Sequence, residues 1–312
     1  MNYCLPMTEG WEINFPPTWV NGYTLERSLR AARIERDGDN RIEYHVPVGC
    51  KVMVDAGARL LSLVNQQVNA GYDVTMTFDD PDGALGYLNR AGFVRLLHPR
   101  ACVWPDRPDD AVLVAREGAS GSLVEFTAIS PVDRASVNDV PRALSTKLSD
   151  VVRIRLQGPK VKKLENATYT IFSELIENVY EHSQTELDGF AALQVYGATS
   201  KAQIVVSDSG VGLLSTLRPV LGRDARELIG HVDVEVLDRL LAKGISRHGL
   251  PRGAGLHSCA KYAREWGATI DLRLETCALS VSPQGVVSEA SISYQDRTPL
   301  RGTHFCFTIP LD

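Results

Sequence analysis

The spacing of apolar residues predicts alternating strands and helices in the first third of the chain. Alternation of apolar and polar residues, or a short apolar run, indicates strands at residues 11–15, 41–48, 52–54 and 73–78. Apolar residues at helical spacing indicate helices at residues 23–33, 58–70 and 82–91. Strands that alternate with helices are typical of α/β folds, so residues 1–108 are expected to form a small α/β domain.

This pattern is interrupted at residues 104–110, which read Trp-Pro-Asp-Arg-Pro-Asp-Asp and indicate a domain edge. Residues 111–115 and 123–129 flank a glycine-containing turn and predict a hairpin. A helical segment follows to about residue 152. We therefore expect a connector over residues 109–155.

The apolar pattern resumes with a long helix from Lys160 to His182. Its apolar stripe consists of Leu164, Ala167, Ile171, Leu175, Ile176 and Val179. Residues 202–207 and 303–310 predict strands, and a helix is expected directly after Leu256, ending at Trp266. These elements predict a second α/β domain over residues 156–312.

Composition narrows the class of protein. The chain has 312 residues, of which 44% are hydrophobic and 23% charged, enough for two packed domains. A net charge of −5 without clustered Lys or Arg gives no reason to expect nucleic acid as a partner. The six cysteines form no CxxC pair and are expected as free thiols in a reducing compartment. With no apparent signal peptide and no apolar run of membrane-spanning length, we expect a cytoplasmic protein without a membrane segment.

The long helix carries the first candidate chemistry, at Glu174 and Asn178. Residues four apart lie one turn from each other on the same side of a helix. An amide oxygen at Asn178 could ligate Mg²⁺, which prefers oxygen ligands and keeps phosphate oxygens and waters beside it. A carboxylate at Glu174 could accept a proton from an attacking water or hydroxyl. Taken alone, this pair fits a solvated helix face better.

A second candidate is the sequence Asp208-Ser-Gly210-Val-Gly212, directly after a predicted strand. A carboxylate at the end of a strand could accept a hydrogen bond from the exocyclic amine of adenine. Glycines next to it would let the backbone approach a flat base, because they have no Cβ. The alternative is a tight strand-to-helix turn without a ligand.

The third and fourth candidates lie nearer the end of the chain. Gly253, Gly255 and Leu256 precede a helix, whose first N–H groups could hold phosphate. Any of Lys243, Arg247, His248 and Arg252 could add positive charge there, although the same stretch also fits a flexible basic loop. Thr303 begins the final strand directly after Gly302, and its hydroxyl could reach the base.

In this order, the four pieces resemble the Bergerat nucleotide-binding fold of the GHKL superfamily, which includes DNA gyrase, heat-shock chaperone ATPases, sensor histidine kinases and MutL. The resemblance covers about residues 155–312 and implies a two-layer α/β sandwich that binds ATP and Mg²⁺. It implies that Asp208 contacts adenine and that Glu174 and Asn178 lie beneath the phosphates. It also implies that residues 213–252 form a lid that closes over them.

The N-terminal domain weakly resembles a STAS domain, the fold of anti-sigma-factor antagonists. The resemblance rests on Val52-Met-Val-Asp-Ala-Gly57, the helix after it, and residues 87–93. That family carries a phosphorylated serine or threonine where this chain has Ala56, which lacks a hydroxyl. The resemblance therefore implies a docking or sensing module without that switch, and any other small α/β domain with this period fits as well.

The sequence also narrows the choice within the superfamily. No histidine lies between His98 and His182, so the helix before the ATP domain has no phosphoacceptor of the histidine-kinase type. A second domain of the kind that follows the ATP fold in gyrase and MutL is not expected, and no GxxxxGK[ST] loop is present.

We therefore expect a Mg-dependent ATPase acting as a regulatory or signalling switch. A protein partner is expected to bind through residues 1–108. A homodimer is a further possibility. The alternatives are a serine/threonine protein kinase of the anti-sigma-factor type and an ATP-binding scaffold without turnover. Water and a protein hydroxyl both stay open as the phosphoryl acceptor.

Overall fold

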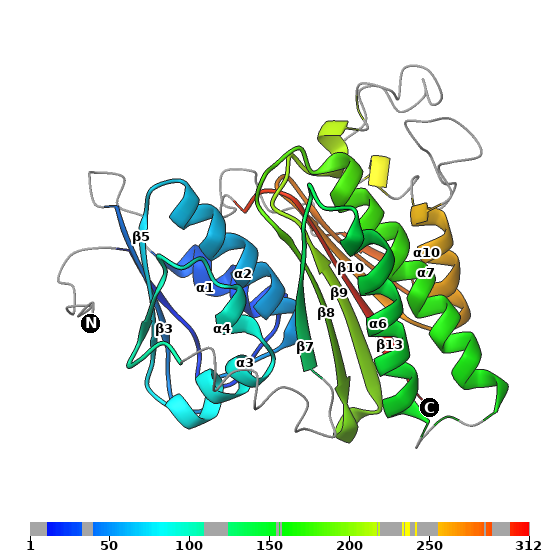
Figure 1. Ribbon diagram of the computed structural model, residues 1–312, viewed down its shortest axis with the longest axis horizontal. Helices are drawn as coiled ribbons and strands as arrows, with labels where there is room; N and C mark the ends of the chain where they lie inside the picture. Colours follow the sequence, from blue (N-terminus) through cyan, green and yellow to red (C-terminus); the bar gives the residue numbers. More distant parts are fainter. Residues whose placement is uncertain are drawn as a thin grey trace. The chain divides into compact units, whose positions relative to one another are not determined.

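Figure 1 shows the protein as a computed structural model. The structure describes residues 11–32, 40–108, 124–153, 156, 158–216, 218, 233, 235–237, 241, 255–283, 285–288 and 300–311. The chain divides into two compact units, Met1–Ser120 with Val124–Phe126, and Gly121–Leu123 with Thr127–Asp312. Among the described residues, none of the helices has both the length and the apolar character that a membrane span requires.

The first unit contains a parallel four-stranded sheet in the order β1-β3-β5-β6 (Figure 1). Its strands are β1 (Trp11–Asn14), β3 (Arg41–Val46), β5 (Asp73–Phe78) and β6 (Cys102–Trp104), and a short parallel pair is formed by β2 (Trp19–Val20) and β4 (Lys51–Val52). Its helices are α1 (Gly22–Ala31), α2 (Val54–Asn69), α3 (Gly86–Arg90) and α4 (Phe93–Leu96). Strands in sequential order joined by helices are repeated β-α-β units, which confirms the predicted small α/β architecture of this segment.

Two predicted elements of the first unit are wrong in their bounds. The expected strand at residues 52–54 stops at Val52, and α2 begins at Val54 rather than at residue 58. The apolar run is buried as the first turn of a helix, where the Asp55 carboxylate accepts a hydrogen bond from the Gly22 N–H at 2.7 Å. Ala56 lies in this turn and is 1% exposed.

The expected helix at residues 82–91 is also divided. It consists of a π-helical turn at Pro81–Leu85 and the short helix α3. Proline at the first position has no N–H to lose, and the Asp80 side chain accepts a hydrogen bond from the Gly83 N–H at 3.0 Å. The turn is therefore closed by a side chain that helical periodicity does not reveal.

The second unit is built on a seven-stranded sheet in the order β12-β11-β10-β13-β9-β8-β7. The strands are β7 (Val124–Ile129, of which Thr127–Ile129 belong to this unit), β8 (Gly189–Tyr196), β9 (Lys201–Ser207), β10 (Thr269–Leu274), β11 (Ala278–Ser282), β12 (Gly285–Ser288) and β13 (Thr303–Pro310). The helices are α6 (Ala135–Val152), α7 (Pro159–His182) and α10 (Gly255–Glu265). Figure 1 shows these three helices on one face of the sheet, with α7 between the other two. This is a two-layer α/β sandwich.

The predicted apolar stripe of α7 is confirmed as the centre of this unit's core. All six of its residues are buried, and all but Ala167 belong to the core cluster that also contains residues of α6, α10 and the sheet. Burial of this stripe fixes the rotation of α7 about its axis. It therefore determines where the polar residues at the C-terminal end of the helix lie.

The predicted hairpin can be followed only in its second half, because residues 111–115 lie outside the described residues. That half is β7, at the edge of the seven-stranded sheet next to β8. The five described cysteines, Cys50, Cys102, Cys259, Cys277 and Cys306, are free thiols.

Candidate functional site

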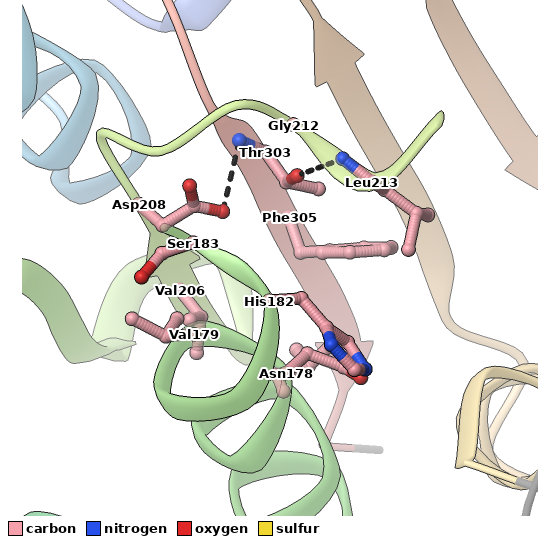
Figure 2. Close-up of a pocket in the computed structure, with 11 residues that line it drawn as sticks. Asn178, Val179, His182, Ser183, Val206, Asp208, Gly212, Leu213, Thr303 and Phe305 are labelled. Carbon is pink, nitrogen blue, oxygen red and sulfur yellow. Dashed lines mark hydrogen bonds between the residues drawn. The ribbon is translucent and has the colours of Figure 1, made fainter. Parts of the chain in front are cut away.

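A pocket in the second unit lies where the C-terminal end of α7 meets the end of β9 and the beginning of β13 (Figure 2). Its empty volume, including the part open to solvent, is about 360 Å³. The lining residues are Leu175, Asn178, Val179, His182, Ser183, Val206, Asp208, Gly212, Leu213, Thr303 and Phe305. Most of the wall is apolar, with a few polar groups among the apolar side chains.

Helix α7 contributes Asn178 and His182, which lie one turn apart (Figure 2). Val179 lies beside them and belongs to the buried stripe, so packing against the sheet sets the direction of both polar side chains. The His182 side chain is 16% exposed. Helix packing thus directs an amide and an imidazole toward the same cavity.

Asp208 follows the last residue of β9 and is held by backbone donors. Its Oδ1 accepts a hydrogen bond from the Gly210 N–H at 2.7 Å, and its Oδ2 accepts one from the Thr303 N–H at 2.9 Å. Burial raises the pKa of this carboxyl from 3.8 to about 6, and the hydrogen bonds from Gly210 and Thr303 oppose the rise. Asp208 is therefore a buried, directed acceptor that is mostly ionised at pH 7.

Glycines permit the tight backbone packing around this carboxylate. A Cβ on Gly210 would overlap the carbonyl of Ser183, and a Cβ on Gly302 would overlap the carbonyl of Asp208. Gly302 also has a φ of +99°, which L side chains rarely adopt. The Thr303 hydroxyl that follows accepts a hydrogen bond from the Leu213 N–H at 2.9 Å (Figure 2).

Glu174 is one helical turn before Asn178 but does not line the pocket. Its carboxylate lies against the first residue of α10, where a Cβ on Gly255 would overlap Oε2. Burial, with a smaller contribution from Glu177, raises the pKa of Glu174. Leu256, the next residue of α10, is buried in the core rather than directed to the pocket.

The structure thus brings four of the predicted binding residues together in one pocket: Asn178, Asp208, Gly212 and Thr303. Gly210 donates its N–H to the Asp208 carboxylate. Glu174 and Gly255 lie next to each other beside the pocket. Lys243, Arg252 and Gly253, together with most of the predicted lid, lie outside the described residues. That any of these residues binds nucleotide stays a prediction.

Several residues of the wall have no binding role among the predictions from sequence. His182 could have been found from its spacing, because it is four residues after Asn178 on the same helix. Val206 and Phe305 could have been found from strand alternation, since each lies two residues from a predicted site residue. Ser183 carries no such signal.

The chemistry of the wall fits a flat heteroaromatic base. Apolar side chains such as Val206 and Phe305 can cover its faces, and the Asp208 carboxylate can accept a hydrogen bond from an amine on its edge. No group of three His, Cys, Asp or Glu residues in the described part of the chain could hold a metal ion. The Asn178 amide oxygen instead fits Mg²⁺ that is carried mainly by phosphate oxygens and water.

Comparison with known families gives the same assignment. Residues 163–312 match the family described as histidine kinase-, DNA gyrase B- and HSP90-like ATPase. The chain matches no curated protein. Proteins of this family bind ATP, generally with Mg²⁺, and the match begins within α7 and includes every residue of the pocket wall. The C-terminal half of the chain is a GHKL-type ATPase domain, as the order of its sequence motifs predicts.

Proposed function

We propose that the C-terminal domain hydrolyses ATP in a Mg²⁺-dependent reaction, and that the bound nucleotide acts as a regulatory switch. The observation that carries the proposal is the common pocket of Asn178 and Asp208, which come from different layers of the sandwich. One residue faces the position expected for phosphate and the other is a buried acceptor for a base. The family of ATP-binding domains to which residues 163–312 belong supports the same nucleotide.

Each end of the nucleotide has a partner in this proposal. Asp208 accepts a hydrogen bond from the exocyclic amine of adenine, while Val206 and Phe305 contact the base. Asn178 supplies an amide oxygen to Mg²⁺, which neutralises charge on the phosphates when bound. Because these side chains are set by the core and by backbone hydrogen bonds, they need little rearrangement to bind.

Glu174 is the proposed general base. It accepts a proton from water as the water oxygen bonds to the γ-phosphorus and the bond from that phosphorus to the β,γ-bridging oxygen breaks. The products are ADP and inorganic phosphate. A carboxyl whose pKa is raised by burial is a stronger base than a solvated one, which suits this role. Glu174 lies beside the pocket rather than in its wall, so this step requires the carboxylate to turn toward the phosphates.

The first unit is proposed to transmit the nucleotide state to a protein partner. It is a separate α/β unit, and Ala56 is buried in the first turn of α2 without a hydroxyl. Phosphorylation at this position is therefore not part of the proposal. The STAS-like character of the unit remains our hypothesis.

The test compares Glu174→Gln with the wild type and with Glu165→Gln, a control on the same helix paired with Lys162. ATP affinity is measured by calorimetry, and phosphate release is measured with Mg²⁺ and with excess EDTA. We expect Glu174→Gln to retain ATP affinity within about threefold and to lose phosphate release by roughly 100-fold or more. EDTA should abolish release, and the control should behave like the wild type.

Three other results would each change the proposal. Undiminished phosphate release by Glu174→Gln would remove the general base. Transfer of the γ-phosphate to a serine or threonine hydroxyl of a protein would identify a kinase. Tight ATP binding without turnover under any condition would leave an ATP-binding scaffold.

A further inference from the structure

A row of buried polar side chains crosses the sheet of the second unit at the strand ends next to Asp208. Arg273 on β10 is opposite His304 on β13, which is opposite Ser207 on β9. Their exposed fractions are 1%, 0% and 0%. Because neighbouring residues of a strand point to opposite faces, this row is on the face opposite to Phe305 and the pocket.

Arg273 and His304 both bind the turn that precedes Thr303. The Arg273 guanidinium donates from Nη1 to the Leu300 carbonyl oxygen, and His304 Nε2 is 3.1 Å from the Arg301 carbonyl oxygen. A carbonyl can only accept, so the proton of a neutral His304 lies on Nε2. Its Nδ1 then accepts from the Ser207 hydroxyl at 2.5 Å. Two successive carbonyls of the turn are thus fixed by buried donors.

This turn continues directly into the base-binding end of the pocket. Gly302 packs against the backbone carbonyl of Asp208, and the next residue, Thr303, donates its N–H to Asp208 Oδ2 at 2.9 Å. The Asp208 N–H in turn donates to the Thr303 carbonyl at 3.0 Å. Any displacement of the Leu300–Gly302 turn would therefore move one of the two donors that direct the carboxylate.

Burying a guanidinium inside a sheet costs more free energy than burying a neutral side chain that could make a purely structural contact. Burying a charge costs free energy, and apolar residues of similar size often replace buried charges without loss of stability. A second polar group on the same face is neutral: Gln203 donates to the Thr308 hydroxyl and accepts from Tyr196. Arg273 is a buried charged residue, and it lies in the row that borders Asp208.

We propose that Arg273 and His304 are positioning residues for recognition of the nucleobase. They hold the Leu300–Gly302 turn and, through Thr303, keep the Asp208 carboxylate directed at the amine of adenine. The proposal rests on the proposed function, in which Asp208 receives that amine. Neither Arg273 nor His304 touches the nucleotide.

The test compares two nucleotides in each variant: ATP, and purine riboside triphosphate, which keeps the purine, ribose and phosphates but lacks the exocyclic amine. Arg273→Met removes the donors at similar length, and Arg273→Lys restores one. Gln203→Met removes a buried polar group on the same face, away from the Asp208 row, and serves as the matched control. Dissociation constants and thermal unfolding are measured for all four proteins.

We expect Arg273→Met to weaken ATP binding by about tenfold or more and purine riboside triphosphate binding by less than about threefold. Arg273→Lys should recover part of the preference for ATP, whereas Gln203→Met should alter stability without changing the ratio of the two affinities. An equal loss for both nucleotides in Arg273→Met would show a merely structural role and overturn the proposal.

Two further results remain decisive. If Arg273→Met does not fold, His304→Leu is compared with His304→Gln, which keeps a side-chain donor, and the same base-dependent loss is expected in His304→Leu. An unchanged affinity ratio there overturns the proposal. If the wild type binds both nucleotides equally, the proposed contact between Asp208 and the amine has failed, which is distinct from failure of Arg273 to position it.

Discussion

Two carboxylates of the second unit differ in how the fold holds them. Asp208 is fully buried and accepts two backbone hydrogen bonds, one from Gly210, two residues away, and one from Thr303, 95 residues away. Glu174 is half-buried and accepts no hydrogen bond from the residues that the structure describes. Burial is the largest cause of the raised pKa in both carboxyls, but hydrogen bonds oppose it only at Asp208.

This difference matches the two tasks proposed for them. A residue that recognises a base must point in one direction before the ligand arrives, because ordering it afterwards would cost binding free energy. A general base must move a proton and needs a raised pKa more than a fixed direction. In this proposal the fold holds the recognition residue rigidly and leaves the general base less constrained.

The largest effect is expected where the rigid carboxylate loses its charge, in Asp208→Asn. The asparagine would present one NH₂ group to a backbone N–H or to the adenine amine, so at least one donor would face another donor. Loss of a hydrogen bond to a charged group costs about 1.5–3 kcal/mol, so ATP affinity should fall by roughly 100-fold when the opposed donor is added. Calorimetric titration with ATP measures it.

Asp188→Asn is the matched control for this prediction. Burial raises the pKa of Asp188 as it does that of Asp208, but Asp188 does not line the pocket. Its variant should bind ATP like the wild type. Normal ATP binding by Asp208→Asn would mean that adenine does not contact this carboxylate.

A smaller effect, on turnover rather than binding, is expected from Gly255→Ala. The added Cβ would overlap Glu174 Oε2, the end of a flexible side chain, so the carboxylate can move away at little cost to folding. Alanine is also the better helix former, by about 0.8–1 kcal/mol within a helix. We expect a melting temperature at or above that of the wild type and phosphate release lower by roughly tenfold, because Glu174 is displaced.

A melting temperature that falls together with ATP affinity would contradict this prediction, since it would mean that Gly255 supports the fold rather than the position of Glu174. Gly158→Ala provides a contrast. Gly158 has no neighbour within 4 Å of an added Cβ but has a φ of +62°, so that variant should lose stability without a selective loss of turnover.

The course of α7 could be predicted from the sequence because a single long stripe determines it, and the observed bounds differ from the predicted ones by one residue at the N-terminus. Strand β8 was not predicted, since Gly189–Tyr196 is buried along almost its whole length and shows no alternation. Strands β10, β11 and β12 were also missed, although apolar and polar residues do alternate in β10 and β11. The absence of alternation therefore explains the missing prediction of β8 but not of β10 or β11.

Within the site, the sequence indicated residues that belong to glycine-containing motifs at strand ends, such as Asp208 and Thr303. It could not indicate that Arg273 lies opposite His304, the residue after Thr303, because that relation depends on the pairing of β10 with β13. Nor could it show that Glu174 lies against Gly255 rather than in the pocket wall. Such facts follow from strand register and helix packing across distant parts of the chain.

Lowering the pH removes the charge of Asp208 without replacing its side chain, so the pH dependence of ATP binding gives a milder test of the same carboxylate. The pKa of Asp208 is raised to about 6, so the group is ionised above that pH and protonated below it. Both of its oxygens already accept backbone N–H groups, and a proton would replace the acceptor that adenine needs. The preference for ATP over purine riboside triphosphate should be constant above pH 7 and fall by about tenfold at pH 5.

The use of two nucleotides removes the contribution of their phosphates, which titrate alike. The preference should be lost as the pH falls through about 6, and it should return on raising the pH. A preference that stays constant from pH 8 to pH 5 would show that Asp208 remains ionised, or that it does not contact the amine.

The smallest effect is expected at the less constrained carboxylate, from Glu177→Gln. The charge of Glu177 is the second cause of the raised pKa of Glu174, after burial, so removing it should lower that pKa without moving the carboxylate. Like charges one helical turn apart interact by about 0.2–0.5 kcal/mol, which corresponds to about a twofold change in the ionisation constant of Glu174.

Because a general base acts in its ionised form, phosphate release by Glu177→Gln should exceed that of the wild type by about twofold on the acid side of the profile and equal it at high pH. Glu165→Gln, nearer the N-terminus of the same helix, should leave the pH dependence of phosphate release unchanged. If the fall in phosphate release at low pH is not shifted in Glu177→Gln but is absent in Glu174→Gln, burial alone determines the basicity of Glu174. If this fall persists in Glu174→Gln, another group accepts the proton. The contrast between a fixed recognition carboxylate and a mobile catalytic one then does not hold.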